Sequence, residues 1–330
     1  MKPFSLTQPK DADAAIQAHA KLPDAQFIGG GTNLLDLMKY GVMEPKSLVD
    51  LQDLSFHEIG PGSDGGLRLG AGVTNAETAE HPKVKKDYPL LSQAILSGAS
   101  PQLRNMATNG GNLLQRTRCY YFYDCATACN KRRPGSGCAA LKGFNRIHAI
   151  LGASEHCIAT HPSDMCVALV ALDAVVKVRG PEGEREIAVE EFHRLPGENP
   201  EKDTVLKESE LILSIELPSS NFSKHSHYLK VRDRESYAFA LVSVAAALQL
   251  SGGRIIDSRV ALGGVAHKPW RARAAEDFLK DKECDRDLFL QAGKLVVKDA
   301  RGYGHNDFKL ELAPRAVAEA LLQAWKGQES

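Results

Sequence analysis

The sequence predicts an α/β fold followed by a smaller α+β domain, and three observations support this. A short strand, three consecutive glycines and a helix follow one another at residues 25–40. The regular pattern stops at residues 117–156, where a cysteine- and glycine-rich segment has the character of an insertion. A polar stretch at residues 218–226 separates this part from a C-terminal part with a different pattern.

The first part alternates strand and helix patterns, which is typical of packed α/β layers. Residues 195–203 are rich in proline, glycine and charge, so they predict a long loop. Helices are expected at residues 10–20, 32–40, 88–99 and 162–173, and strands at residues 25–29, 47–51 and 67–71.

The C-terminal part mixes strand and helix patterns without alternation. Residues 237–250 are apolar enough for a buried strand or a buried helix, and periodicity alone leaves both open. Residues 254–265 have strand character, and helices are expected at residues 271–280, 287–299 and 313–325. We therefore expect a smaller α+β domain here.

Charge and hydropathy exclude several classes of partner. The 41 basic and 41 acidic residues cancel, so no overall field attracts nucleic acid or an anionic membrane. No segment approaches the roughly 20 apolar residues of a spanning helix, and residues 1–15 lack the apolar stretch of a secretory signal. We expect no nucleic acid and no membrane as partner, and export only alongside a partner that carries a signal.

Two glycine-rich turns are candidates for binding phosphate. In FIGGGTNL (27–34) a strand ends in glycines and enters a helix, so backbone N–H groups can approach an anion. The segment matches neither the P-loop nor G-x-G-x-x-G, and a plain glycine-rich turn stays possible. In ATNGGN (107–112) paired glycines again offer free backbone donors, although Asn-Gly is also a common tight turn. Two such turns favour a ligand with two phosphates.

The cysteines predict a metal centre. Six of the seven cysteines fall between Cys119 and Cys166, and the intervals between them contain five, three, eight, 18 and eight residues, without a C-x-x-C pair. Zinc sites commonly use tight pairs, so wide and irregular spacing favours an iron-sulfur cluster wrapped by a loop. Cys284 stands alone and is expected to be structural or exposed.

The segment is also locally basic. Residues 116–146 carry seven basic groups against one acid, Asp124. Cations stabilise an anionic cluster. The aromatic run at residues 120–123 keeps open a stacking platform for nucleic acid. Reduced cysteines in a solvated basic loop are a third reading.

Several stretches carry a family resemblance, among them FIGGGTNLLDLMK, LLSQAILSGASPQLRNMATNGGNLLQRTRC, CIATHPSDM and KVRDRESYAFALVSVAAAL. They resemble the FAD-binding medium subunits of molybdenum hydroxylases, the xanthine dehydrogenase and aldehyde oxidoreductase family. The similarity is strongest to the FAD subunits of periplasmic aldehyde oxidoreductases, which hold an extra 4Fe-4S cluster.

The resemblance implies a two-part FAD-binding α/β domain of the PCMH type at residues 1–222 and a C-terminal flavoprotein domain at residues 223–330. The first domain divides into residues 1–55 and 56–222, with the iron-sulfur insertion at residues 117–157. The cofactor-binding positions that the resemblance implies are Gly29, Gly30, Gly31, Thr32, Asn33, Leu34, Thr108, Gly110, Gly111, Asn112, Ser163, Asp164, Lys230 and Tyr237.

The resemblance also implies that Cys119, Cys129, Cys138 and Cys157 hold the cluster. Cys125 is a rival to Cys129. Cys166 lies in an apolar helix pattern, where a free cysteine is usually a small core residue. Three histidines, His148, His156 and His161, are interpreted as hydrogen-bonding or surface residues, and Asp50 as a strand end.

No catalytic constellation is evident in the chain, so substrate chemistry is expected in a partner. The resemblance implies an FAD- and 4Fe-4S-containing electron-transfer subunit of a heterotrimeric molybdenum-dependent aldehyde oxidoreductase. The partners implied are a small subunit with two 2Fe-2S clusters, a large molybdenum-cofactor subunit and an external electron acceptor. The 4Fe-4S cluster is interpreted as structural rather than as a relay.

Other functions stay open. The chain could serve a related hydroxylase of N-heterocycles, act as a stand-alone flavin oxidase, or bind nucleic acid through a zinc or iron-sulfur centre. The compartment is periplasmic if a signal-bearing partner exports the chain, and otherwise cytoplasmic.

Overall fold

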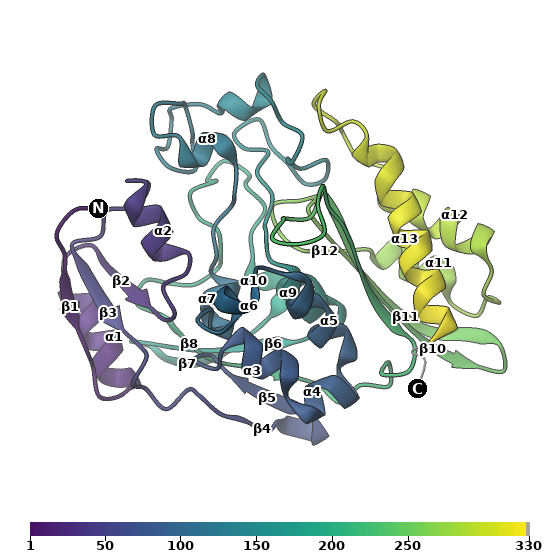
Figure 1. Cartoon of the computed structure of the whole chain (residues 1–330), viewed down its shortest axis with the longest axis horizontal. Coiled ribbons are helices and arrows are strands. Elements are labelled where there is room, and N and C mark those ends of the chain that lie inside the picture. The colour runs from purple at the N-terminus through teal and green to yellow at the C-terminus, as the bar shows by residue number, and fades with distance from the viewer. Residues whose placement is uncertain (328–330) are drawn as a thin grey trace.

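The computed structural model describes residues 1–327 as three β-sheets with helices packed against them (Figure 1). The smallest sheet is N-terminal, parallel and ordered β1-β3-β2. It contains β1 (Ser5–Thr7), β2 (Ala25–Ile28) and β3 (Ser47–Asp50), with α1 (Ala12–Lys21) and α2 (Leu34–Lys39) between them. Asp50 ends β3, which confirms its interpretation as a strand end.

The second sheet is antiparallel, with the order β4-β5-β8-β6-β7. Its strands are β4 (Ile59–Pro61), β5 (Leu67–Gly70), β6 (Val175–Gly180), β7 (Gly183–Ala188) and β8 (Leu211–Leu217). The accompanying helices are α3 (Asn75–Glu80), α4 (Pro82–Asp87), α5 (Pro89–Ser97), α6 (Pro101–Arg104), α7 (Asn109–Leu113), α9 (Asp164–Ala171) and α10 (Val189–Phe192), with a 3₁₀ turn at Ser63–Gly65. Every residue of α9 is buried, so this helix forms the centre of the core.

The third sheet is antiparallel, with the order β12-β11-β10-β9. Its strands are β9 (Ser226–Val231), β10 (Val242–Ser251), β11 (Arg254–Gly263) and β12 (Trp270–Arg271). The C-terminal helices are α11 (Arg273–Leu279), α12 (Arg286–Val296) and α13 (Lys309–Lys326), and α13 lies along this sheet in Figure 1.

Strand β10 settles the ambiguity of residues 237–250 in favour of a strand from Val242 onward, and residues 237–241 are irregular. Alternate residues enter different cores: Ala245 and Ala247 face the core around α9, whereas Val244, Ala246 and Leu248 face the core around α13. A strand buried on both faces has no polar positions, which explains why periodicity alone did not decide.

Residues 117–157 stand apart from the sheets as an irregular excursion, at the top of Figure 1. They contain only α8 (Tyr120–Tyr123) and the 3₁₀ turn Ala139–Leu141. We call this stretch the cysteine segment. Its small core includes Cys119, Phe122 and Cys129, so sulfur atoms occupy positions that aliphatic side chains fill elsewhere.

The predicted α/β and α+β fold class is confirmed, and the expected helix bounds differ from the observed ones by up to four residues. The largest difference is in the last helix, which was expected at residue 313 but begins at Lys309, with Pro314 inside it. No helix among residues 1–327 is long and apolar enough to cross a membrane.

Candidate functional site

A cleft of about 1630 Å³ opens between the first sheet, the second sheet and the loop that follows β9. Drug-sized ligands occupy pockets of about 300–1,000 Å³, so this cleft suits a larger ligand. The structure brings all fourteen predicted cofactor-binding residues to its wall, namely Gly29, Gly30, Gly31, Thr32, Asn33, Leu34, Thr108, Gly110, Gly111, Asn112, Ser163, Asp164, Lys230 and Tyr237.

The first glycine turn presents unpaired donors to the cleft. The backbone N–H groups of residues 30–33 donate to no acceptor within the described part of the chain. The side-chain nitrogen of Asn33 is also buried without a partner, while its Oδ1 accepts from the Arg116 N–H at 2.8 Å. These donors fit an anion that approaches the backbone closely.

Packing against the second turn requires glycine at two of these positions. A Cβ on Gly30 would lie 1.6 Å from the carbonyl oxygen of Met106, and a Cβ on Gly29 would lie 2.8 Å from Thr108 Oγ1. Gly31 has φ +70°, which disfavours residues with a Cβ. The two turns therefore touch and form one wall.

The prediction of free backbone donors in the second turn is wrong. This turn forms the start of α7, where the N–H groups of Asn109 and Gly110 donate to the carbonyls of Val73 and Ala71, each at 2.9 Å. The N–H of Gly111 donates to the side chain of its N-cap residue, Thr108, at 3.2 Å. The backbone that follows β5 accepts these hydrogen bonds, so the turn contributes close approach and side chains to the cleft.

A buried ion pair closes the opposite wall. Asp164, in the first turn of α9, accepts from Lys230 of β9 at 2.7 Å, and the two side chains are 7% and 4% exposed. Its other oxygen accepts from the Tyr228 hydroxyl at 2.7 Å, and Lys230 also donates to the Ser97 carbonyl at 2.9 Å. Full pairing makes this charged contact tolerable in the interior. The pair ties α9 to the third sheet.

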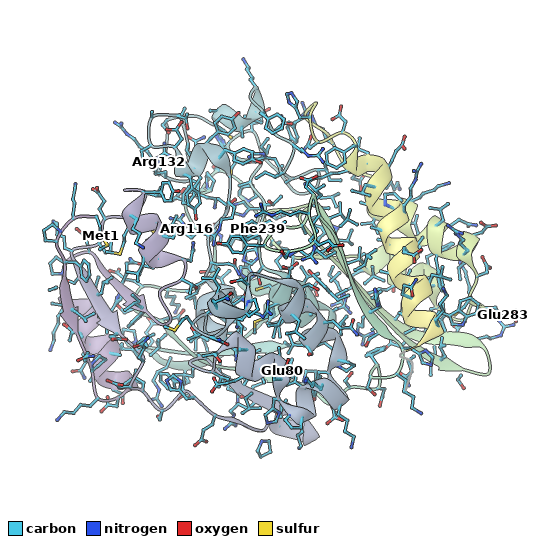
Figure 2. The ribbon with its side chains drawn as sticks, viewed as in Figure 1. Met1, Glu80, Arg116, Arg132, Phe239 and Glu283 are labelled. Atoms are coloured by element: carbon cyan, nitrogen blue, oxygen red, sulfur yellow. The ribbon has the colours of Figure 1, made fainter. Side chains whose placement is uncertain are left out.

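Aromatic side chains border the cleft. Tyr237 is 59% exposed and has φ +52°. Phe239 is 49% exposed, and the guanidinium of Arg118 lies 5.2 Å from its ring centroid. Figure 2 labels Phe239 and Arg116, which line the cleft between the N-terminal sheet and the third sheet. Neither Arg118 nor Phe239 was predicted as a site residue.

Four cysteines of the cysteine segment share a second, small cavity, which we call the sulfur cavity. Cys119, Cys129, Cys138 and Cys157 line it together, and none forms a disulfide. An antiparallel bridge joins Cys129 to Cys138 and places them side by side. The fold thus brings the four predicted ligands together.

The other cysteines lie elsewhere. Cys125 is exposed, with its sulfur 3.5 Å from the Gly41 carbonyl oxygen, and it does not line the sulfur cavity. Cys166 is fully buried in α9, which confirms its interpretation as a core residue. Cys284 is half-buried in the C-terminal part.

Burial controls the protonation of the thiols. It raises the pKa of Cys119 to about 12 and that of Cys157 to about 11. Backbone N–H groups directed at sulfur oppose this effect: those of Phe122 and Tyr121 lower the pKa of Cys119, and the N–H of Ala159 donates to Cys157 at 3.4 Å. Such N–H···S contacts are also what tune iron-sulfur clusters.

Several basic residues in and next to the segment form ion pairs with acidic residues of the protein. Arg116 and the buried Lys131 both pair with Asp203, and Arg146 pairs with Asp233. Burial alone would raise the pKa of Asp203, but the Lys131 ammonium and the Arg116 guanidinium outweigh it and hold that pKa well below its ordinary value. The loop at residues 195–203 thereby anchors the segment.

Arg132 is engaged in a different way, with backbone carbonyls as partners. It donates to the carbonyls of Tyr121, Phe122 and Thr127. Figure 2 labels it within the segment. Lys131, Arg132 and Arg146 are thus committed to partners within the protein, whereas Arg133 and Lys142 are exposed.

Three histidines pack between the cleft and the cysteine segment. Burial lowers the pKa of His193 and His267 to about 4, and that of His161 well below its ordinary value. The ring atoms of His161 and His193 lie within 4.8 Å of each other and of the Cys166 sulfur. Burial also raises the pKa of Cys166 to about 12, so the group consists of neutral core side chains.

The remaining predicted histidines lie near the sulfur cavity. His148 is buried, and its Nε2 lies 3.1 Å from the Cys119 sulfur, which confirms a hydrogen-bonding role. Burial lowers the pKa of His148 to about 4. His156 is exposed and borders the cavity.

The comparisons with known proteins define the class. Residues 2–220 match the family described as FAD binding domain in molybdopterin dehydrogenase, and residues 227–324 match the CO dehydrogenase flavoprotein C-terminal domain. The chain belongs to the family of FAD-binding subunits of molybdenum hydroxylases and is an oxidoreductase subunit. It is 52% identical over 319 residues to the aldehyde oxidoreductase FAD-binding subunit PaoB of Escherichia coli K12, with 95% of each chain covered.

Solved structures show the same fold. Quinoline 2-oxidoreductase from Pseudomonas putida 86 superposes with a TM-score of 0.75 at 27% identity, covering 98% of this chain and 97% of that one. Carbon monoxide dehydrogenase from Hydrogenophaga pseudoflava superposes with a TM-score of 0.77 at 24% identity, covering 98% of each chain.

Sequence reasoning missed the partners that fix the site. Asp203 lies in a segment predicted only as a charged loop, and Tyr228 lies in a strand that was not predicted. The burial of Lys131 has no local signal either, because its partners are some 70 positions away along the chain.

Proposed function

We propose that this chain is the FAD- and 4Fe-4S-containing electron-transfer subunit of a heterotrimeric molybdenum-dependent aldehyde oxidoreductase. Identity of 52% over 95% of both chains to a protein named aldehyde oxidoreductase FAD-binding subunit supports the aldehyde class. The partners would be a small subunit with two 2Fe-2S clusters and a large molybdenum-cofactor subunit.

The observation that carries the FAD placement is the wall of unpaired donors at the first glycine turn. Residues 29–34 would bind the pyrophosphate, because the backbone N–H groups of residues 30–33 and the side-chain nitrogen of Asn33 lack partners. Thr108, Gly110, Gly111 and Asn112 would contact it from the second turn through side chains and close approach. At the far wall, Ser163, Asp164, Lys230 and Tyr237 would flank the isoalloxazine.

Bound FAD supplies a carrier that can exchange electrons one at a time with iron-sulfur centres and pass them to an external acceptor. This chain's residues bind and orient the cofactor. Because the Asp164–Lys230 pair is already formed, this wall of the cleft need not rearrange when the cofactor binds. The exposed ring of Tyr237 borders the cleft. We identify no catalytic constellation among residues 1–327, and we assign substrate oxidation to the molybdenum subunit.

We assign Cys119, Cys129, Cys138 and Cys157 as the ligands of a 4Fe-4S cluster. Four unpaired cysteines sharing one cavity, with N–H groups directed at sulfur, support this donor set. We regard the cluster as structural, because it lies in a segment with little secondary structure. The domain division at residues 1–222 and 223–330 is likewise our proposal, supported by the loop between β8 and β9.

A second candidate is a hydroxylase of N-heterocycles, which the likeness to quinoline 2-oxidoreductase favours. Co-expression with the partner subunits and purification of the complex distinguishes the two by turnover of aldehydes against N-heterocycles. We expect one FAD and about four irons with four acid-labile sulfides per chain, and aldehyde turnover only in the complex. A chain with zinc in place of iron, or with no flavin, would refute the corresponding assignment.

A further inference from the structure

His148 occupies a protected position directly behind the Cys119 sulfur. Its Nε2 lies 3.1 Å from that sulfur, within the range of a hydrogen bond to sulfur, and the residue is 1% exposed. It does not line the sulfur cavity itself. The imidazole is therefore placed to act on a ligand rather than to serve as one.

The C-terminal part of the chain holds this histidine in place. The carbonyl of His148 accepts from Lys309 Nζ at 2.9 Å and from Asn306 Nδ2 at 3.3 Å. Lys309 is fully buried and also donates to the Gly264 carbonyl at 2.7 Å, while the His148 N–H donates to the Asn145 carbonyl at 3.0 Å. The backbone at His148 is thus fixed from both sides.

The ring has little freedom to turn away from the sulfur. The rings of Tyr120 and Tyr121 flank it, with centroids 6.5 and 6.3 Å away. The other ring nitrogen, Nδ1, is buried with no partner among residues 1–327. The contact that Nε2 makes with the Cys119 sulfur therefore decides which tautomer is favoured.

Metal binding makes the direction of this hydrogen bond unambiguous. While Cys119 is a thiol, either partner can supply the bridging hydrogen. A cysteine that ligates iron is a thiolate and can only accept, so Nε2 must then donate. A donor aimed at a ligand sulfur withdraws negative charge from it, which stabilises the reduced form of a cluster.

We propose that His148 is a positioning residue for the iron-sulfur centre: its Nε2–H donates to the Cys119 sulfur, fixes that ligand and raises the reduction potential of the cluster. This inference rests on the proposed 4Fe-4S assignment. It further implies that the segment at residues 306–309 supports the cluster through the His148 backbone, although it contacts no cysteine of the cavity in the described structure.

The test compares His148→Leu, His148→Gln and His305→Leu in the full chain co-expressed with its partners. The Gln carboxamide can place a donor near the position of Nε2, whereas Leu cannot. His305 is exposed, packs against the ring of Phe144 and does not line the sulfur cavity, so it is the matched control. The readouts are iron and sulfide content and an EPR-monitored potentiometric titration of the cluster.

We expect His148→Leu to keep its iron but to shift the reduced-to-oxidised ratio at fixed potential about tenfold toward the oxidised form, or ~59 mV for one electron. His148→Gln should retain most of the wild-type potential, and His305→Leu should match the wild type. An unchanged potential in iron-loaded His148→Leu would overturn the inference. Absence of iron from the wild type would instead overturn the 4Fe-4S assignment.

A measurement on the wild type covers the case in which His148→Leu fails to fold. With ¹⁵N-labelled histidine, the reduced cluster should show a weak coupling to one imidazole nitrogen by pulsed EPR. The coupling should persist in His305→Leu. Its absence from the iron-loaded wild type would also overturn the inference.

Discussion

The cleft and the cysteine segment adjoin each other in the structure, yet the side chains that form them are held in place by different means. The cleft lies between regular elements, and its walls are fixed by glycine packing, by the α7 hydrogen bonds and by the Asp164–Lys230 pair. The cysteine segment has one helical turn and one 3₁₀ turn, and thiols make up much of its small core. The cleft can therefore preform without its ligand, whereas the order of the segment should depend on the proposed cluster.

Cys129→Ala should give the largest effect, because it removes one of four ligands from a segment with little core of its own. We expect the iron content to fall from about four per chain to near zero, with rapid proteolysis inside residues 117–157 and retention of FAD. Metal analysis, limited proteolysis and flavin absorbance measure these three results.

Cys125→Ala is the matched control, since this cysteine lies in the same segment but outside the sulfur cavity. It should retain iron and protease resistance. If Cys129→Ala lost iron without becoming sensitive to protease, the proposed dependence of the segment on metal would be contradicted.

Gly30→Ala should have the opposite effect: it should disturb the cleft and leave the cysteine segment intact. Its Cβ would overlap the Met106 carbonyl oxygen, so the two turns must separate. Forced overpacking costs about 1–3 kcal/mol, and the disturbed donors should weaken FAD binding at least tenfold while iron stays at the wild-type level. Fluorescence titration of the flavin-free protein measures this effect. Gly60→Ala, where a Cβ meets nothing within 4 Å, should leave FAD affinity unchanged.

The two regions also differed in how far the sequence could predict them. The glycine turns were recognisable because their conformation is local, and the fourteen predicted positions do line one cleft. The state of their donors was not predictable: the second turn is saturated because β5 and the residues after it, Ala71 and Val73, lie alongside. Such pairing depends on residues distant in sequence.

For the cysteine segment, spacing favoured a metal centre, and the family resemblance selected four cysteines among six. The structure places those four in one cavity and Cys125 outside it. The supports of the segment could not be predicted, because Asp203 and Lys309 both lie far downstream of it in the sequence. A buried lysine has no signature distinct from an exposed one until its partners are known.

Acid should weaken the packing between the two regions. His193 and His267 titrate near pH 4 in the folded chain but near 6.5 when unfolded, because burial lowers their pKa. Below about pH 6.5 the unfolded chain binds more protons, so the free energy of unfolding falls as pH decreases toward 4, by up to about 1.4 kcal/mol per pH unit for each group. Urea unfolding at pH 7 and pH 5 measures the slope.

His193→Gln is the variant that isolates one histidine. The Gln side-chain amide can still donate to the Leu113 carbonyl, which His193 Nε2 contacts at 2.8 Å. The change in the free energy of unfolding per pH unit, measured between pH 7 and pH 5, should decrease by up to about 1.4 kcal/mol, the contribution of one titrating group. A slope equal to that of the wild type would show that His193 does not titrate in this window.

Thr108→Ala should have the smallest effect, and it separates two roles of the second turn: capping α7 and contacting the cofactor. The Thr108 hydroxyl caps α7 by accepting from the Gly111 N–H and lies against Gly29 at the wall of the cleft. Loss of the cap should cost about 1 kcal/mol.

The same loss is expected for Ser100→Ala, which removes the cap of α6, where the serine oxygen accepts from the Leu103 N–H. The hydroxyl hydrogen of Thr108 stays available to a phosphate oxygen, so only Thr108→Ala should also weaken FAD binding, by a few-fold. Thermal unfolding and FAD titration of both variants test this: equal FAD affinities would mean that the second turn acts on the cofactor only through its packing against the first.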